Sequence, residues 1–222
     1  MIIKVKSKFI PMYTIDVFNS RAVEYDSWYS KHPSAAKAEG DAVKLLNLGG
    51  IGVDVGAGSG FFTRLTGAIA LEPSMQMIKL AKDRTWAVVS GVGELMPIRD
   101  SSMDYVTIIV TLCFAMNPEN MLRESVRILK NGGRLITCIV PLNSPFGKRY
   151  SELGSMGHPY YSMARFFTVK QVVGILSGLG LKVTSYVATL GKGVGDYYEE
   201  PRMVNGDEAE GYGFVCINAV KP

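Results

Sequence analysis

The feature that most constrains this chain is a strand, a glycine-rich turn and a short helix over residues 51–72, IGVDVGAGSGFFTRLTGAIALE. Apolar β-forming residues lead to Asp54, glycines follow at positions 56, 58 and 60, and a second short strand ends at Glu72. Glycine lets the backbone turn through positive φ and approach a ligand with no Cβ in between. This layout predicts an α/β fold that holds a nucleotide-like ligand at the start of a helix.

The spacing of these residues argues against NAD as the ligand. The GxGxxG fingerprint of dinucleotide-binding folds would need a glycine where Phe61 stands, and the third glycine falls one residue early. Glu72 lies 16 residues after Gly56 (72 − 56), which is fewer than the roughly 20 typical of dinucleotide folds. An acid in this place can accept hydrogen bonds from both ribose hydroxyls, or it can be a helix-terminal acid that the helix dipole favours.

Three separated motifs resemble one family of enzymes. DVGAGSG followed by LEPSMQM resembles the class I S-adenosylmethionine-dependent methyltransferases. GVGELMPIRDSSMDYV resembles that family's adenine-side segment, with Val92 where many relatives carry an aspartate. Residues 141–183 resemble a small prokaryotic subgroup, called type 11, which is related to the ubiquinone and menaquinone methyltransferases. The resemblance covers roughly residues 18–183.

The resemblance implies a fold and a domain organisation. The fold is α/β, with a Rossmann-like seven-stranded mostly parallel sheet, an antiparallel last strand and helices on both faces. Residues 1–222 are expected to form a single methyltransferase domain. Its parts are an N-terminal lid and helices (1–48), a cofactor-binding core (49–140), a substrate-side segment (141–180) and a C-terminal strand pair (181–222). Residues 191–211 are expected to be a mobile loop between the two last strands.

The resemblance also implies the cofactor, S-adenosyl-L-methionine, with S-adenosyl-L-homocysteine as the product. Residues 14–30 and the helix after Pro33 precede the cofactor core, and the helix is expected to be structural. Glu94 is either near the cofactor or a surface acid. The predicted cofactor-binding residues are Asp54, Gly56, Ala57, Gly58, Gly60, Glu72, Pro73, Ser74, Gly93, Glu94 and Thr111.

The acceptor side is expected to be aromatic. By resemblance, the segment AxxYDxW lies over the cofactor as a lid and excludes water, although its apolar residues at helical spacing could instead be a packing stripe. His158 would titrate near neutrality and is a candidate general base, or a surface residue of its loop. No catalytic residue is assigned. The predicted acceptor-binding residues are Tyr25, Trp28, Phe114, Tyr150, His158, Tyr161 and Arg165.

Composition and charge bear on several classes of protein. The 222 residues suffice for one domain with a sizeable core. A net charge of +4 is weak support for nucleic-acid binding, and no apolar run approaches the length of a membrane span. Cys113, Cys138 and Cys216 are far apart, with no CxxC or Cys/His pairing. We therefore expect no metal site and buried, reduced thiols in a cytoplasmic protein.

The cofactor makes the predicted mechanism simple. A sulfonium methyl group is already activated, so the protein mainly has to orient a nucleophile and exclude water. The missing CxxxCxxC pattern favours polar methyl transfer over radical chemistry. We expect a small-molecule acceptor. The alternatives are an RNA- or protein-modifying methyltransferase and a non-catalytic cofactor-binding protein, with an NAD-dependent oxidoreductase last. No oligomeric state is predicted.

Overall fold

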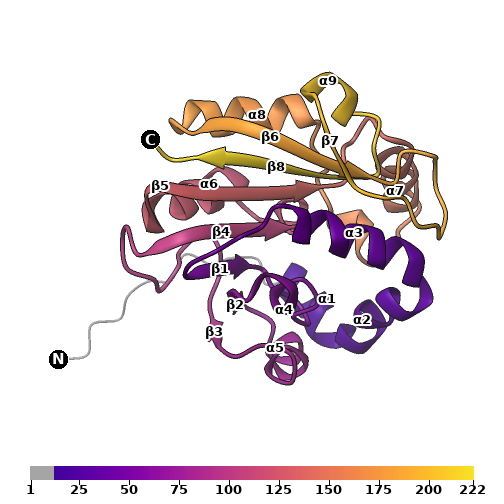
Figure 1. Cartoon of the computed structure of the whole chain (residues 1–222). Helices are drawn as coiled ribbons and strands as arrows, with labels where there is room; N and C mark the ends of the chain where they lie inside the picture. Colours follow the sequence, from indigo (N-terminus) through magenta and orange to yellow (C-terminus); the bar gives the residue numbers. More distant parts are fainter. Residues whose placement is uncertain (1–12) are drawn as a thin grey trace.

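A computed structural model describes residues 13–222 of the chain, which form one eight-stranded sheet with helices on both faces (Figure 1). The sequence of residues 1–13, which contains several lysines, suggests a basic arm that is strand-like or disordered, and this segment lies almost entirely outside the described residues. The helices are α1 (Tyr13–Ser20), α2 (Ala22–Lys31), α3 (Pro33–Leu45), α4 (Thr63–Thr66), α5 (Met75–Lys82), α6 (Pro118–Ile128), α7 (Pro145–Ser155), α8 (Val169–Gly178) and α9 (Gly206–Ala209). Two 3₁₀ turns are η1 (Leu112–Phe114) and η2 (Tyr161–Met163).

The sheet has the strand order β3-β2-β1-β4-β5-β8-β6-β7. Strands β1 to β5 are parallel, and β8 pairs antiparallel with both β5 and β6. The predicted α/β sheet with an antiparallel last strand is confirmed. The strands are β1 (Gly52–Val55), β2 (Ile69–Glu72), β3 (Val88–Ser90), β4 (Met103–Ile109), β5 (Leu129–Ile139), β6 (Lys182–Thr189), β7 (Arg202–Val204) and β8 (Phe214–Val220).

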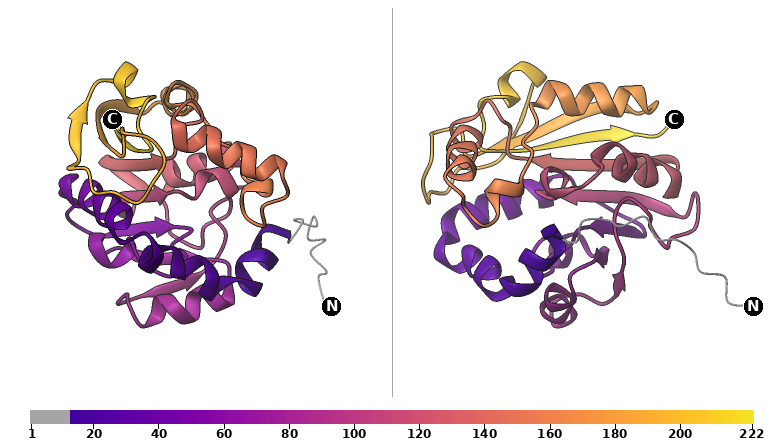
Figure 2. Two further views of the ribbon diagram at one scale, coloured as in Figure 1. Left: turned by 90° about the vertical axis from the view of Figure 1, so that its right-hand side faces the viewer. Right: turned by 180° about the vertical axis from the view of Figure 1, so that it is seen from behind.

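The core has two layers because neighbouring side chains of a strand point to opposite faces of a sheet. On the central strand β4, Val106 and Ile108 belong to one buried cluster, which α6 and α8 cover. Tyr105 and Ile109 belong to a second cluster on the other face, which α3 covers. This arrangement explains the nearly continuous apolar run of β4, since both of its faces are buried. Figure 2 shows the helices on the two sides of the sheet.

The C-terminal part differs from the prediction in one respect. Residues 191–211, expected to be a loop, contain β7 and the short helix α9. Strand β7 pairs antiparallel with β6, with Tyr186 opposite Val204, so the sheet has eight strands and β6 is not its edge. A three-residue strand carries too short a pattern to be recognised in a sequence.

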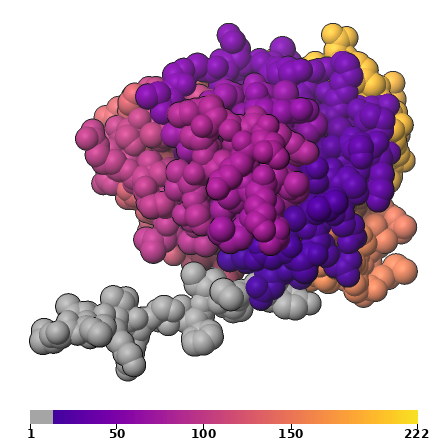
Figure 3. Space-filling view, turned by 90° about the horizontal axis from the view of Figure 1, so that it is seen from below, coloured from indigo at the N-terminus to yellow at the C-terminus, as the bar shows by residue number. Residues whose placement is uncertain are grey.

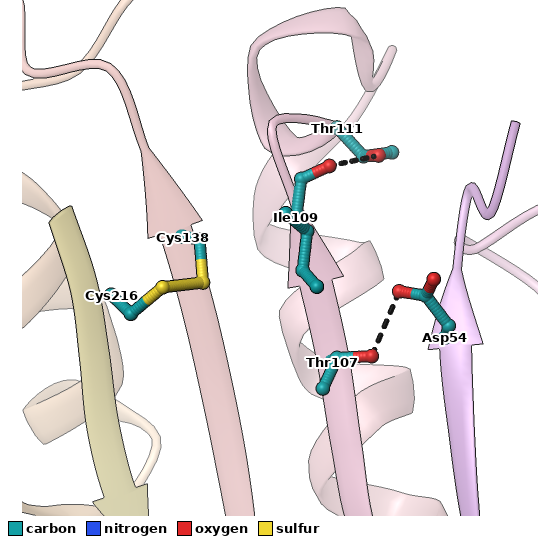
Figure 4. The surroundings of a disulfide bond; sticks show 6 residues. All are labelled: Asp54, Thr107, Ile109, Thr111, Cys138 and Cys216. Atoms are coloured by element: carbon teal, nitrogen blue, oxygen red, sulfur yellow. Dashed lines mark hydrogen bonds between the residues drawn. A yellow bond between two sulfur atoms is a disulfide. The ribbon is translucent and has the colours of Figure 1, made fainter. Parts of the chain in front are cut away.

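The expectation of three reduced cysteines is wrong. Cys138 on β5 and Cys216 on β8 form a disulfide (Figure 4), and Cys113 is the remaining free cysteine. The two bonded cysteines are 78 residues apart in the sequence but directly opposite each other in the register of β5 and β8. The insertion of β8 beside β5 therefore brings together two cysteines whose pairing no local sequence motif indicates. No helix of residues 13–222 is long and apolar enough to cross a membrane.

Candidate functional site: two adjoining cavities

The glycine turn forms a tight, open loop at the carboxyl end of β1. Gly56, Gly58 and Gly60 have φ values of 68°, 55° and 81°, a region that side chains strongly disfavour. A Cβ on Gly56 would lie 2.2 Å from Cγ2 of Thr111, whereas a Cβ on Gly58 would meet nothing within 4 Å. The loop therefore packs tightly against Thr111, which follows β4, and leaves open space beside Gly58.

Glu72 stands beside this open space at the end of β2. Its carboxylate accepts backbone hydrogen bonds from Gly58 and Ser74, each at 2.8 Å, and the residue is only 5% exposed. Burial raises the pKa of this carboxyl to about 7, against the two backbone donors, which lower it. A carboxylate has about four acceptor positions, so two are left for hydroxyl donors of a ligand.

Asp54, one of the predicted cofactor-binding residues, lies buried in the core. Its carboxylate accepts a hydrogen bond from Thr107 at 2.8 Å (Figure 4). It also accepts one from Thr63 at 2.6 Å, and only 2% of the residue is exposed. Burial raises its pKa to about 6. These bonds join β1 to α4 and β4 beneath the glycine loop, so the side chain supports the loop from within the core.

The first cavity, of about 460 Å³, opens above the glycine loop. Ligand sites of proteins typically fall between roughly 300 and 1,000 Å³. Three of the predicted cofactor residues, Asp54, Ala57 and Gly60, do not reach its wall. The remaining predicted residues all line it: Gly56, Gly58, Glu72, Pro73, Ser74, Gly93, Glu94 and Thr111.

The far end of the first cavity is formed by residues after β3. Val92 lines it and offers no side-chain hydrogen bond, as the sequence indicates. The carboxylate of Glu94 accepts hydrogen bonds from the backbone amides of Met116 at 3.0 Å and Asn117 at 3.3 Å. Glu94 therefore holds the segment after η1 against the cavity.

The N-terminal helices close the first cavity from outside. Phe18 on α1 and Tyr25 on α2 line it, and Figure 3 shows these helices, in indigo, beside the purple and magenta segment after β1. The amide oxygen of Asn19 accepts a hydrogen bond from Ser74 at 2.9 Å. Asp26 on α2 pairs with Arg84 and also accepts a hydrogen bond from Ser59 of the glycine loop.

A second cavity, of about 290 Å³, adjoins the first. Arg165 does not line it, because its exposed side chain lies over the ring of Phe167, with 4.8 Å between the guanidinium carbon and the ring centre. The other residues predicted to bind the acceptor all line this cavity: Tyr25, Trp28, Phe114, Tyr150, His158 and Tyr161. Residues from α2, η1, α7 and η2 are thus brought together.

The two cavities share three lining residues, Tyr25, Val110 and Phe114. Val110 follows β4 and has φ 54°, a rare conformation for a β-branched residue. Such outliers cluster at ligand sites, where the surrounding structure holds them in place. The backbone amide of Val110 donates to the carbonyl of Cys138 at 2.9 Å, which contributes to holding this turn.

Within residues 13–222, no hydrogen bond or ion pair joins His158 to a carboxylate that would make it a stronger base. Burial lowers its pKa, and Glu24 and Arg21 have opposing smaller effects. Its Nδ1 lies 3.4 and 3.5 Å from the backbone amides of Tyr160 and Tyr161, and its ring stacks on Tyr161 with 4.4 Å between ring centres. With Nδ1 as the acceptor, the neutral imidazole keeps its proton on Nε2.

The sequence interpretation missed Glu39, which lines the second cavity from α3 and is 7% exposed. The helix was expected to be structural only. A signal was present, because Glu39 shares the buried face of α3 with Ala35, Ala42 and Val43, four or three residues away. An acid on the apolar stripe of a helix is a feature that packing alone does not explain.

The site shows what a ribose-bearing ligand needs, namely an open glycine loop and a buried carboxylate with free acceptor positions. Within residues 13–222, no group of three or more His, Cys, Asp or Glu side chains could hold a metal ion.

Comparisons with known proteins point in one direction. A family model for a methyltransferase domain matches residues 53–137. An uncharacterized protein of Methanocaldococcus jannaschii is 33% identical over 211 residues, which are 93% of this chain and 100% of that protein. A demethylmenaquinone methyltransferase of Tropheryma whipplei is 34% identical over 98 residues, which are 39% of this chain and 40% of that enzyme.

A solved structure from Thermotoga maritima is similar over 94% of this chain and 100% of its own, with a TM-score of 0.86 and 33% identity. It is described as a SAM-dependent methyltransferase and a possible histamine N-methyltransferase.

Proposed function

The chain belongs to the S-adenosylmethionine-dependent methyltransferases, and on that premise we propose that it transfers a methyl group to a small-molecule nucleophile bound in the second cavity. The observation that carries this proposal is the junction of the two cavities at Tyr25, Val110 and Phe114. A donor in the first cavity and an acceptor in the second would meet there. The description of the Thermotoga relative, which names a small amine as its possible substrate, agrees with a small acceptor.

The residues of the first cavity would hold the cofactor. The Glu72 carboxylate would accept hydrogen bonds from the ribose hydroxyls, and the loop around Gly58 would receive the amino-acid part. Val92 would meet the adenine by packing. When bound, the sulfonium supplies an activated methyl group, so the chemistry needs no metal and no covalent intermediate with the protein.

The chain's own residues would orient the acceptor and exclude water. Phe18 of α1 packs edge to face on Phe114 with 5.1 Å between ring centres, and Tyr25 of α2 packs on Phe18 at 5.2 Å. These contacts place aromatic rings over the junction of the cavities. Holding two reactants in line can lower the activation barrier by on the order of 7 kcal/mol or more in favourable cases.

The test is a pair of measurements on the intact protein. The melting temperature should rise with S-adenosylhomocysteine and stay unchanged with NAD, because a ligand stabilises the folded protein only if it binds to that state. Radiolabelled methyl transfer from S-adenosylmethionine should then be measured with a panel of small nucleophiles, with RNA and with protein extracts. Transfer to RNA or protein but to no small molecule would contradict the proposal, as would tight cofactor binding with no turnover on any acceptor.

A further inference from the structure

The second cavity contains a carboxylate that methyl transfer as proposed above does not use. Glu39 is 93% buried (100 − 7) and lines this cavity but not the first one. Burial is the one cause that shifts its pKa, which rises to about 8, and no cation of residues 13–222 offsets this effect. A buried acid without a cationic partner is costly for a fold to keep.

Tyrosines line the same cavity as this carboxylate. Burial raises the pKa of the phenols of Tyr25, Tyr29, Tyr150 and Tyr161, and the nearby Glu39 raises each of them further. The rings of Tyr150 and Tyr161 stack with 4.3 Å between their centres. Ring faces attract organic cations, and a carboxylate among them adds a full negative charge.

Glu39 lines the second cavity together with the three residues that line both cavities, Tyr25, Val110 and Phe114. A molecule that fills the second cavity and pairs with Glu39 would therefore reach the junction, where the methyl group is expected. The small cavity, of about 290 Å³, fits a compact molecule.

We propose that the second cavity binds a small organic amine, and that Glu39 pairs with its ammonium group and takes a proton from it before methyl transfer. This inference rests on the proposed function. It identifies the substrate class and gives Glu39 the role of substrate-binding residue and proton acceptor.

The amine enters as R–NH3⁺, and one proton passes from nitrogen to the Glu39 carboxylate, directly or through one water. The nitrogen lone pair forms a bond to the methyl carbon while the carbon–sulfur bond breaks, and its electron pair stays on sulfur. The products are the N-methylammonium ion and the neutral thioether, and Glu39 is left protonated. The one proton that the reaction releases to water leaves Glu39 when the next ammonium ion binds.

Other ionisable groups face the cavity, and their effects must be distinguished from those of Glu39. Burial raises the pKa of the Cys113 thiol to about 12 and lowers the pKa of His158. Glu24, Lys31 and His32 line the cavity from α2 and its C-terminal end, with Glu24 and Lys31 exposed. All of these groups remain in a Glu39→Gln variant, so a difference between that variant and wild type reports Glu39.

The first experiment is a calorimetric titration of the protein saturated with S-adenosylhomocysteine. The probes are primary amines of increasing size, from ethylamine to 2-phenylethylamine, and the alcohols of the same shape. We expect at least one amine to bind wild type at least tenfold more tightly than its alcohol. Glu39→Gln should lose this preference and keep its affinity for S-adenosylhomocysteine. The matched control is Glu208→Gln, an exposed acid at the end of α9's first turn that should change neither value.

A second measurement needs only the wild-type protein, in case Glu39→Gln does not fold. Near pH 7, a Glu39 with a pKa of about 8 is mostly protonated. Binding an ammonium ion favours its ionised form, so amine binding should release a proton, which titrations in buffers of different ionisation enthalpy detect. Binding of the matching alcohol should release none.

The outcomes separate this inference from the proposed function. Equal binding of every amine and its alcohol, or no proton release with the tightest amine, overturns the inference. A preference for amines that survives in Glu39→Gln overturns it as well. If S-adenosylhomocysteine itself does not bind, the proposed function fails. If it binds and methyl transfer occurs only to neutral acceptors, the proposed function stands and the assignment of Glu39 fails.

Discussion

The carboxylate of Glu72 accepts a hydrogen bond from the backbone amide of Gly58 at 2.8 Å, so the end of β2 and the glycine loop are fixed to each other. The other oxygen of Glu72 accepts from the amide of Ser74, which caps α5. One buried side chain thus connects a strand, a loop and a helix N-terminus around the first cavity. Its charge and its position can be tested separately.

Replacing Glu72 should weaken cofactor binding. Glu72→Ala removes the acceptor for ribose hydroxyls and the partner of Gly58, and we expect S-adenosylhomocysteine to bind at least tenfold more weakly, about 1.4 kcal/mol. Calorimetric titration measures this change, and Glu200→Ala, at an exposed loop position, is the control. Unchanged affinity in Glu72→Ala would remove the residue from the site.

The same carboxylate should make cofactor affinity depend on pH. Burial raises the pKa of Glu72 to about 7, and ribose hydroxyls donate best to the ionised form. Affinity should therefore fall as the pH is lowered from about 8 to about 6, because a proton must first leave the carboxyl group. Glu72→Gln should show a flatter profile. Identical profiles in the two proteins would mean that another group, on the ligand or the protein, is responsible.

The conformation of Gly56 predicts a specific sensitivity. With φ 68° and a hypothetical Cβ 2.2 Å from Thr111, Gly56→Ala should lower stability by roughly 1–3 kcal/mol and abolish cofactor binding. Gly174→Ala is the matched control, because that exposed helical glycine has nothing within 4 Å of its Cβ position. The control should gain up to about 1 kcal/mol of stability, because alanine has a higher helix propensity than glycine. Equal denaturation midpoints for the two variants would contradict the geometry of the loop.

Three buried acids predict that the unliganded protein loses stability as the pH rises. Burial raises the pKa of Asp54 to about 6, of Glu72 to about 7 and of Glu39 to about 8. The pKa values of these groups are higher in the folded protein than in the unfolded chain. Their contribution to the free energy of unfolding is therefore fully present below about pH 4, and it is lost as the pH rises to about 8. Denaturant titrations should show this decline in the free energy of unfolding. In Glu39→Gln, the part of the decline nearest pH 8 should be missing. Stability that rises over this range in wild type would contradict the burial of these groups.

Thiol counting tests the disulfide. Of the three cysteines, Cys138 and Cys216 are bonded, so denatured and unreduced protein should take up one alkyl group, at Cys113. After reduction, mass spectrometry should find three. In the native protein even Cys113 should react slowly, since burial raises its pKa to about 12 and the thiolate is the reactive form. Three adducts without reductant would show that the bond does not form.

The sequence was most informative where local chemistry decides the structure. The TVKQ spacing of residues 168–171 predicts a capping box, and Thr168 and Gln171 form it at the start of α8. The glycine loop likewise lies where its pattern indicates. The pairing of Cys138 with Cys216 could not be predicted, because it depends on the register of strands far apart in the chain. The position of Asp54 within the core depends likewise on Thr107 of β4. The partners that decide these roles are brought together only by the folded sheet.

The position of β8 has a consequence for biosynthesis. This strand follows all the others in the chain, yet it separates β5 from β6 in the sheet. While residues 214–220 of a nascent chain are still inside the ribosome, the backbone groups of β5 and β6 that face β8 in the finished sheet are unpaired. The sheet can therefore be completed only after β8 has been synthesised, and until then the exposed edges of β5 and β6 are open to misassociation.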